Sequence, residues 1–159
     1  RRKPAVVGPA MARYNAAPSA ENGRTMSDAT ESTSSAVTSG IRVDVSARFI
    51  PERSSPTDRE WFFAYTITIA NQSDRVVQLL SRHWVITDAD GKVEEVRGPG
   101  VVGQQPILQP GQSFEYTSAC PLSTSFGVMQ GTYQMVTPEG DHFDITIAPF
   151  SLHEPYAIN

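Results

Sequence analysis

Cysteine and long apolar runs are both scarce in this 159-residue chain. Cys120 is the one cysteine, and a typical apolar run is the five residues 61–65. A single cysteine excludes a disulfide within the chain and favours a reducing compartment, so we expect a cytoplasmic protein. A helix needs about 20 apolar residues to span a bilayer, so we expect no membrane insertion.

Basic residues are also few where the chain looks folded. The formal net charge is −4, but residues 41–159 carry 8 basic side chains against 14 acidic ones. Binding to nucleic acid requires clustered lysine and arginine side chains that neutralise phosphates. The acidic balance therefore argues against a nucleic acid as the partner.

Helical periodicity is missing, and alternation at period two takes its place. Residues 41–49, 60–71, 76–87, 113–117, 129–135 and 143–147 alternate apolar and polar side chains or are rich in β-branched and aromatic residues. Gly and Pro turns separate them at near-regular spacing, and Asp90-Gly91 is typical of a tight hairpin. The pattern predicts an all-β fold, a fibronectin type III or immunoglobulin-like β-sandwich of about seven or eight strands, with Trp84 buried in it.

The first forty residues differ from the remainder. Residues 1–40 are rich in Ala, Ser, Thr, Asn, Gly and Pro and show almost no apolar periodicity. Such a segment buries too little apolar surface to offset its ordering entropy. We expect a disordered extension over residues 1–40 and one domain over residues 41–159, with translation beginning at Met26 or Met11.

Residues 98–103, GPGVVG, match the glycine spacing of a dinucleotide-binding loop. That loop must lead from a strand into a helix, and Pro106 and Pro110 follow here instead, so we reject a dinucleotide fold. A weaker hypothesis is an anion site formed by Arg97 and the backbone of Gly98, Gly100 and Gly103. The favoured interpretation is a loop whose glycines serve positive φ angles or close backbone packing.

Metal and cofactor sites receive little support. The acidic group Asp88, Asp90, Glu94 and Glu95 lacks the regular spacing of an EF-hand loop, and its two glutamates point to opposite faces of a hairpin strand. The three histidines have no ligand spacing. We expect no metal centre and no cofactor.

Catalysis is also not expected. Cys120 with His83 or His142 would be the one candidate for a nucleophilic dyad, but a single thiol in such a domain is more often an inert small hydrophobic residue. No G-x-S-x-G nucleophile motif occurs.

Three segments carry a family resemblance: residues 78–84 (QLLSRHW), residues 98–106 (GPGVVGQQP) and residues 114–118 (FEYTS). Over residues 41–159 the chain resembles the bacterial ApaG family. The resemblance implies the β-sandwich fold and a link to cobalt resistance and magnesium efflux without an established biochemical activity. Similar domains in eukaryotic F-box proteins and in a polymerase-delta-interacting protein look like protein-binding units.

We therefore expect a non-catalytic protein-protein interaction module whose effect on cation efflux is indirect. The partner is an unknown protein, and the surface candidates are Arg82, His83 and Tyr116, together with Phe62. Pairing through edge strands would give a homodimer. The alternative is a protein that binds a small anion such as phosphate or pyrophosphate at residues 98–103, or a divalent cation at the acidic hairpin.

Overall fold

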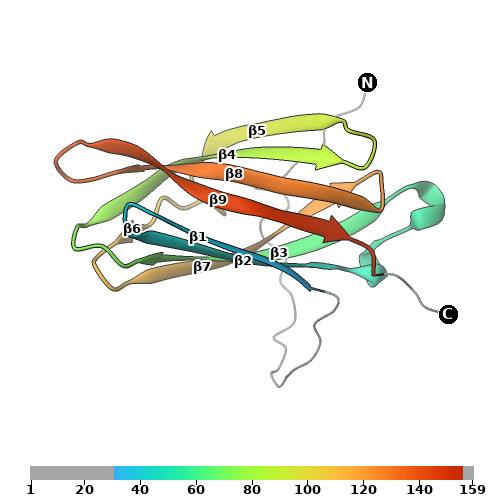
Figure 1. The fold of residues 1–159 in the computed structure, drawn as a ribbon, viewed down its shortest axis with the longest axis horizontal. Coiled ribbons are helices and arrows are strands. Elements are labelled where there is room, and N and C mark those ends of the chain that lie inside the picture. Colours follow the sequence, from blue (N-terminus) through green and yellow to red (C-terminus); the bar gives the residue numbers. More distant parts are fainter. Residues whose placement is uncertain (1–30, 156–159) are drawn as a thin grey trace, which may run out of the picture.

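A computed structural model describes residues 31–155 as two antiparallel β-sheets stacked face to face (Figure 1). The strands are β1 (Glu31–Thr38), β2 (Ile41–Phe49), β3 (Trp61–Asn71), β4 (Val77–Asp88), β5 (Val93–Pro99), β6 (Ile107–Leu108), β7 (Ser113–Leu122), β8 (Phe126–Val136) and β9 (His142–His153). One sheet has the order β1-β2-β3-β7 and the other β5-β4-β8-β9, with β6 also paired to β4. The predicted fibronectin type III/immunoglobulin-like sandwich is confirmed.

Alternation along the strands builds the core between the two sheets. Phe63, Tyr65, Ile67 and Ile69 of β3 are all buried, as their common face predicts. Trp84 of β4 is fully buried, with its ring centroid 5.5 Å from that of Tyr65 in an edge-to-face arrangement. The predicted core strand and the predicted core tryptophan are thus confirmed.

The predicted boundary at residue 40 is wrong for β1. Residues 31–38 form a complete strand paired with β2, and Ser39 and Gly40 make the turn between them with φ angles of 52° and 80°. Residues 1–30, with both proposed start methionines, lie outside the described residues. Hydroxyl groups explain the error, because β1 is Ser- and Thr-rich and carries no apolar stripe for a sequence pattern to detect.

Serine and threonine side chains join the edge of one sheet to the edge of the other. The Ser34 hydroxyl donates to the carbonyl of Ala148 at 2.9 Å, and the Ser151 amide donates to the Ser32 hydroxyl at 3.0 Å. The Thr146 amide donates to the Thr38 hydroxyl at 3.1 Å. These bonds satisfy polar groups along β1 and β9 and close that side of the sandwich.

Three strands are longer than the alternating segments of the sequence predict. The alternating segment 143–147 is part of a longer strand, because β9 continues to His153 and buries Phe150. The alternating segments 113–117 and 129–135 are likewise parts of longer strands, because β7 extends to Leu122 and β8 begins at Phe126. The structure therefore has nine strands within residues 31–155 instead of seven or eight.

The segment between β2 and β3 contains two three-residue 3₁₀ helices, Pro51–Arg53 and Pro56–Asp58. It covers the outer face of β3, where the guanidinium carbon of Arg53 lies 4.5 Å from the Phe62 ring centroid. Phe62 is consequently buried, together with Ile50, Ala64 and Ala119. Within residues 31–155, no helix has the length and apolar character that a membrane span requires.

Removal of β1 tests the corrected boundary. A chain that starts at residue 41 should be less stable than one that starts at residue 31 by about 2–4 kcal/mol, because it loses a strand ladder and the bonds to β9. Urea denaturation of the two truncated chains measures the difference. Equal midpoints would support the boundary at residue 40.

Candidate functional site

The alternation of β4 divides the predicted site residues into two groups. Arg82 is in register with Gly98, and the next residue, His83, is in register with Arg97. Since successive side chains point to opposite faces, Arg82 and Gly98 face the core while His83 and Arg97 face outward. The residues predicted from the sequence thus do not form one site.

Arg82 fastens the glycine-rich loop from the inside. It is 9% exposed, and its Nη1 donates to the carbonyl oxygens of Pro99 at 3.0 Å and Gly100 at 2.9 Å. A Cβ atom at Gly98 would lie 3.0 Å from both terminal guanidinium nitrogens, so the glycine makes room for them. The Arg82 cation is therefore used to hold the protein's own carbonyl groups.

Tyr116 belongs to the same buried region. It is 8% exposed, and its hydroxyl lies 2.5 Å from that of Tyr133, which is in register with Arg82. Burial raises the pKa of Tyr116 and of Tyr65 well above the usual value, although the nearby Arg82 charge acts in the opposite direction. The prediction that Phe62, Arg82 and Tyr116 are exposed is wrong. Of the four predicted surface residues, His83 is the one that reaches the surface.

The glycine-rich loop is a tight turn. The amides of Val101 and Gln104 each donate to the other's carbonyl at 2.8 Å, and Val102 and Gly103 between them have φ angles of 41° and 78°. The Gly100 amide donates to the Leu80 carbonyl at 2.8 Å. Gly100 has a φ of 60°, and a Cβ there would overlap the carbonyl oxygen of Gln104. Gly98, Gly100 and Gly103 thus serve the packing and turn roles that were the favoured interpretation of the sequence.

Glu95 links the two outward-facing side chains, His83 and Arg97, although the sequence did not predict it as part of a partner surface. Its Oε1 lies 2.7 Å from His83 Nε2 and 3.9 Å from Arg97 Nη2. The Arg97 side chain is 71% exposed and that of Glu95 55%. Alternation along β5 could have identified Glu95, since it lies two residues from Arg97 and therefore on the same face.

Uncharged polar side chains extend this face onto β8. The Ser81 hydroxyl donates to Gln134 Oε1 at 2.7 Å, and Gln134 Nε2 donates to the Thr132 hydroxyl at 2.8 Å. Thr132 is in register with His83. We call this set, Ser81, His83, Glu95, Arg97, Thr132 and Gln134, the outer polar surface.

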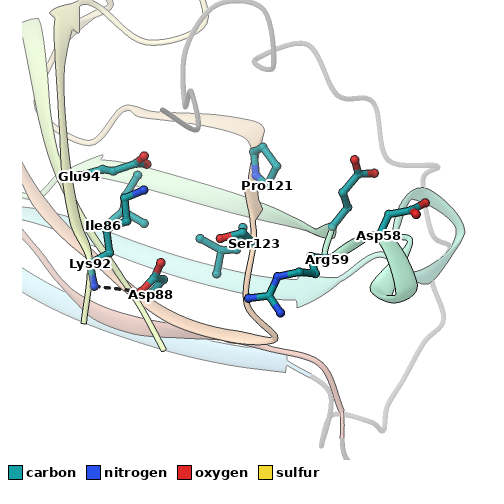
Figure 2. A pocket seen from close by; sticks show the side chains of 10 residues that line it. Asp58, Arg59, Ile86, Asp88, Lys92, Glu94, Pro121 and Ser123 are labelled. Atoms are coloured by element: carbon teal, nitrogen blue, oxygen red, sulfur yellow. Dashed lines mark hydrogen bonds between the residues drawn. The ribbon is translucent and has the colours of Figure 1, made fainter. Parts of the chain in front are cut away.

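A cleft of about 500 Å³ opens at one end of the sandwich (Figure 2). Its walls come from the segment before β3, the β4–β5 hairpin and the end of β7, and it is lined by Asp58, Arg59, Glu60, Ile86, Asp88, Lys92, Glu94, Pro121, Leu122 and Ser123. Four carboxylates face two basic side chains, so the lining is acidic overall. Sequence reasoning missed it because the three segments are far apart in the chain.

One of the four carboxylates, that of Asp88, already accepts hydrogen bonds within the β4–β5 hairpin. Asp88 Oδ1 accepts the amide of Asp90 at 2.9 Å and that of Lys92 at 3.0 Å, which fixes the predicted turn. Among residues 31–155, no three His, Cys, Asp or Glu side chains come together in an arrangement that could hold a metal ion.

Cys120 lies in the core, where burial raises the pKa of its thiol well above the usual value and keeps it protonated at neutral pH. His83 is on the outer face of the opposite sheet, so the sandwich separates the two side chains. The geometry offers no activated nucleophile at this cysteine.

Comparison with known proteins identifies a family for most of the sandwich. Residues 51–137 match the family model described as the ApaG domain. The chain is 54% identical over 123 residues to Protein ApaG of Beijerinckia indica, which covers 77% of this chain and 95% of the relative. It is 56% identical over 120 residues to Protein ApaG of Afipia carboxidovorans, over 76% of this chain and 92% of the relative.

A solved structure agrees with the sequence relatives. The crystal structure of an ApaA protein from Bordetella pertussis resembles this chain with a TM-score of 0.71 and 50% identity, covering 74% of this chain and 95% of that one. The similarity therefore extends to the arrangement of both sheets.

Alanine substitution separates the two kinds of glycine in the loop. Gly100→Ala should cost about 3 kcal/mol or more, because it combines an unfavourable φ with an overlap on the Gln104 backbone. Gly103→Ala should cost about 1 kcal/mol, because its φ is positive but nothing lies within 4 Å of the added carbon. Chemical denaturation of both variants checks the order, and equal losses would contradict the packing role.

Proposed function

The chain belongs to the ApaG family, and we propose that its domain is a non-catalytic, cytoplasmic protein-binding module that acts through the outer polar surface. The observation that carries this proposal is the division of functional groups between the two faces of β4. Three side chains that could take part in chemistry, those of Arg82, Tyr116 and Cys120, are buried. Arg82 and Tyr116 are hydrogen-bonded within the protein, and the Cys120 thiol stays protonated. Three ionisable side chains that stay accessible, His83, Glu95 and Arg97, lie together on the outer face of the same sheet.

The outer polar surface has the character of a recognition surface. The Glu95 carboxylate is half exposed although it lies 2.7 Å from His83 Nε2 and 3.9 Å from Arg97 Nη2, and Arg97 presents its guanidinium to solvent. A partner with complementary polar side chains would gain charge-assisted hydrogen bonds at little conformational cost, since the strands hold these residues rigidly. Any effect of the protein on cobalt resistance or magnesium efflux would then pass through this partner.

Charge reversal within the surface tests the proposal. Crosslinking with mass spectrometry in the native cell identifies the partner, and Arg97→Glu should reduce its crosslinked yield about ten-fold or more through repulsion at the contact. Arg75→Glu is the matched control, because Arg75 is also exposed and weakly paired, with Asp141 at 3.9 Å, outside the outer polar surface.

Two results would count against this function: no stoichiometric partner for the intact protein, or the same yield for both variants. A specific loss with Arg97→Glu supports it, provided that circular dichroism shows both variants folded.

A small-ligand function is the second candidate, and the cleft is the observation that favours it. Its volume of about 500 Å³ falls within the range of small-molecule sites, and Asp88, Lys92 and Glu94 of the acidic hairpin line it. Four carboxylates against two basic side chains favour a cation. Because no three carboxylates of residues 31–155 come together to ligate it, such a cation would keep most of its water ligands. Phosphate or pyrophosphate at residues 98–103 is the other form of this hypothesis, although Arg97 and Gly98 lie on opposite faces of β5.

Calorimetry distinguishes the two forms. If the cleft binds a divalent cation, Mg²⁺ or Co²⁺ should give heat that Glu94→Gln weakens about ten-fold by removing a charge. Glu139→Gln, in the exposed β8–β9 turn, should leave the heat unchanged. Heat with pyrophosphate that Arg97→Gln abolishes would favour the loop instead, and no heat with any ligand at millimolar concentration would remove this candidate.

A further inference from the structure

β5 is an outermost strand, at the top of the view in Figure 1. Two of the four strands that end the sheets, β1 and β9, bond to each other through hydroxyl groups. The other two, β5 and β7, end their sheets on the opposite side of the sandwich. β7 contains Pro121, which has no amide proton for a ladder, whereas the first six residues of β5 all have one.

The orientation of the β5 backbone follows from the bonds at its two ends. Just before β5, the backbone amide of Asp88 donates to the Lys92 carbonyl. Just after it, the backbone amide of Gly100 donates to the Leu80 carbonyl. In an antiparallel pair the residues bonded to the neighbour alternate with those pointing away. Even-numbered residues of β5 therefore bond to β4. Odd-numbered Val93, Glu95 and Arg97 direct their amides and carbonyls toward the outer edge, where no strand of residues 31–155 pairs with them.

Charge then selects a register for a second copy of the strand. Pairing two β5 strands antiparallel about Val96 places Glu95 directly opposite Arg97 of the second copy, and Arg97 opposite Glu95. If the pairing were centred on Glu95 instead, the two Glu95 carboxylates would face each other. If it were centred on Arg97, the two guanidinium groups would do so. Opposite charges across a strand pair stabilise it, and like charges destabilise it.

The inner face of this pairing is also complementary. Val96, which packs against the core, meets Val96 of the second copy. Glu94 meets Gly98, over which the Arg82 guanidinium lies, so opposite charges are close there too. The sequence VEEVRGP is thus self-complementary in one antiparallel register, on both faces of the strand.

We propose that this protein forms a two-fold symmetric dimer by antiparallel pairing of β5 with β5 of a second copy, centred on Val96. The odd-numbered residues supply the backbone hydrogen bonds, and the two Glu95–Arg97 pairs fix the register. The sheet β5-β4-β8-β9 then continues across the two-fold axis into its copy. Val93, with 55% of its surface exposed, is covered by the outer end of the other strand.

The ladder has a defined length. Pro99 lacks an amide proton, and after Gly100 the chain turns into the sandwich, where Val101 is buried. The interface is therefore limited to one seven-residue strand on each side. An interface of this size gives a concentration-dependent dimer instead of an obligate one. The proposal does not depend on the protein-binding function, because the occupant is a second copy of this chain.

Sedimentation equilibrium of charge variants tests the register, with the full chain from micromolar to millimolar concentrations. The wild type should dimerise. Glu95→Arg and Arg97→Glu should each weaken association by about ten-fold or more, because both charge pairs become repulsive. The double variant Glu95→Arg/Arg97→Glu should recover the dimer, since the exchange restores opposite charges. An equimolar mixture of the two single variants should form a heterodimer.

His83→Ala is the control for the contact that Glu95→Arg also removes within one chain, and it should leave dimerisation unchanged. A wild type that stays monomeric over this range overturns the proposal. So does a dimer that the single reversals do not weaken, or one that the double exchange does not restore, provided that circular dichroism shows the variants folded. The double variant also separates the two proposals, because it should still fail to bind a different protein that recognises Arg97.

Discussion

The Arg82 guanidinium is the interaction on which the glycine-rich side of the sandwich depends. A buried cation is costly unless its donors find acceptors, and here carbonyl groups of Pro99 and Gly100 accept from it. Its planar shape fits against Gly98, where a side chain would collide with it. The same contact holds β5 against β4 and fixes the start of the following turn, so one side chain links the strand, the loop and the core.

This contact gives the GPGVVG segment a structural meaning that differs from that of a dinucleotide loop. Gly98 serves the guanidinium, Gly100 serves the close approach of the Gln104 carbonyl, and Gly103 serves the positive φ of the turn. A dinucleotide loop would instead open a helix and direct free amides at a pyrophosphate. The spacing is shared, while the physical reasons for the glycines are not.

The sequence predicted those parts of the fold that depend on apolar alternation. The β3 core face, Trp84 and the Asp90-Gly91 hairpin are all present. It failed for β1, whose hydroxyl groups leave no apolar signal, and for Arg82, which the sequence predicts as a surface residue and the structure buries. Alternation alone places Arg82 on the buried face with Trp84, but only the register with Gly98 shows that the core has space for it.

Register explains a further limit of the sequence. Leu79 and Arg82 are both buried although they are three residues apart, which strict alternation forbids. An irregularity in the β4–β8 register between Leu79 and Ser81 shifts the strand by one residue. A pattern read from one strand cannot locate such a bulge, since the bulge is a property of the pair. The outer polar surface, which begins at Ser81, therefore depends on it.

β5 combines these constraints in a single strand. Its even-numbered residues bond to β4 and turn Glu94, Val96 and Gly98 toward the cleft, the core and Arg82. Its odd-numbered residues turn Glu95 and Arg97 toward solvent and direct their backbone groups to the outer edge. Substitutions at even positions should therefore act through stability, and those at odd positions through association. Because the strand keeps strict alternation, the two kinds of effect can change independently in a chain that retains its fold.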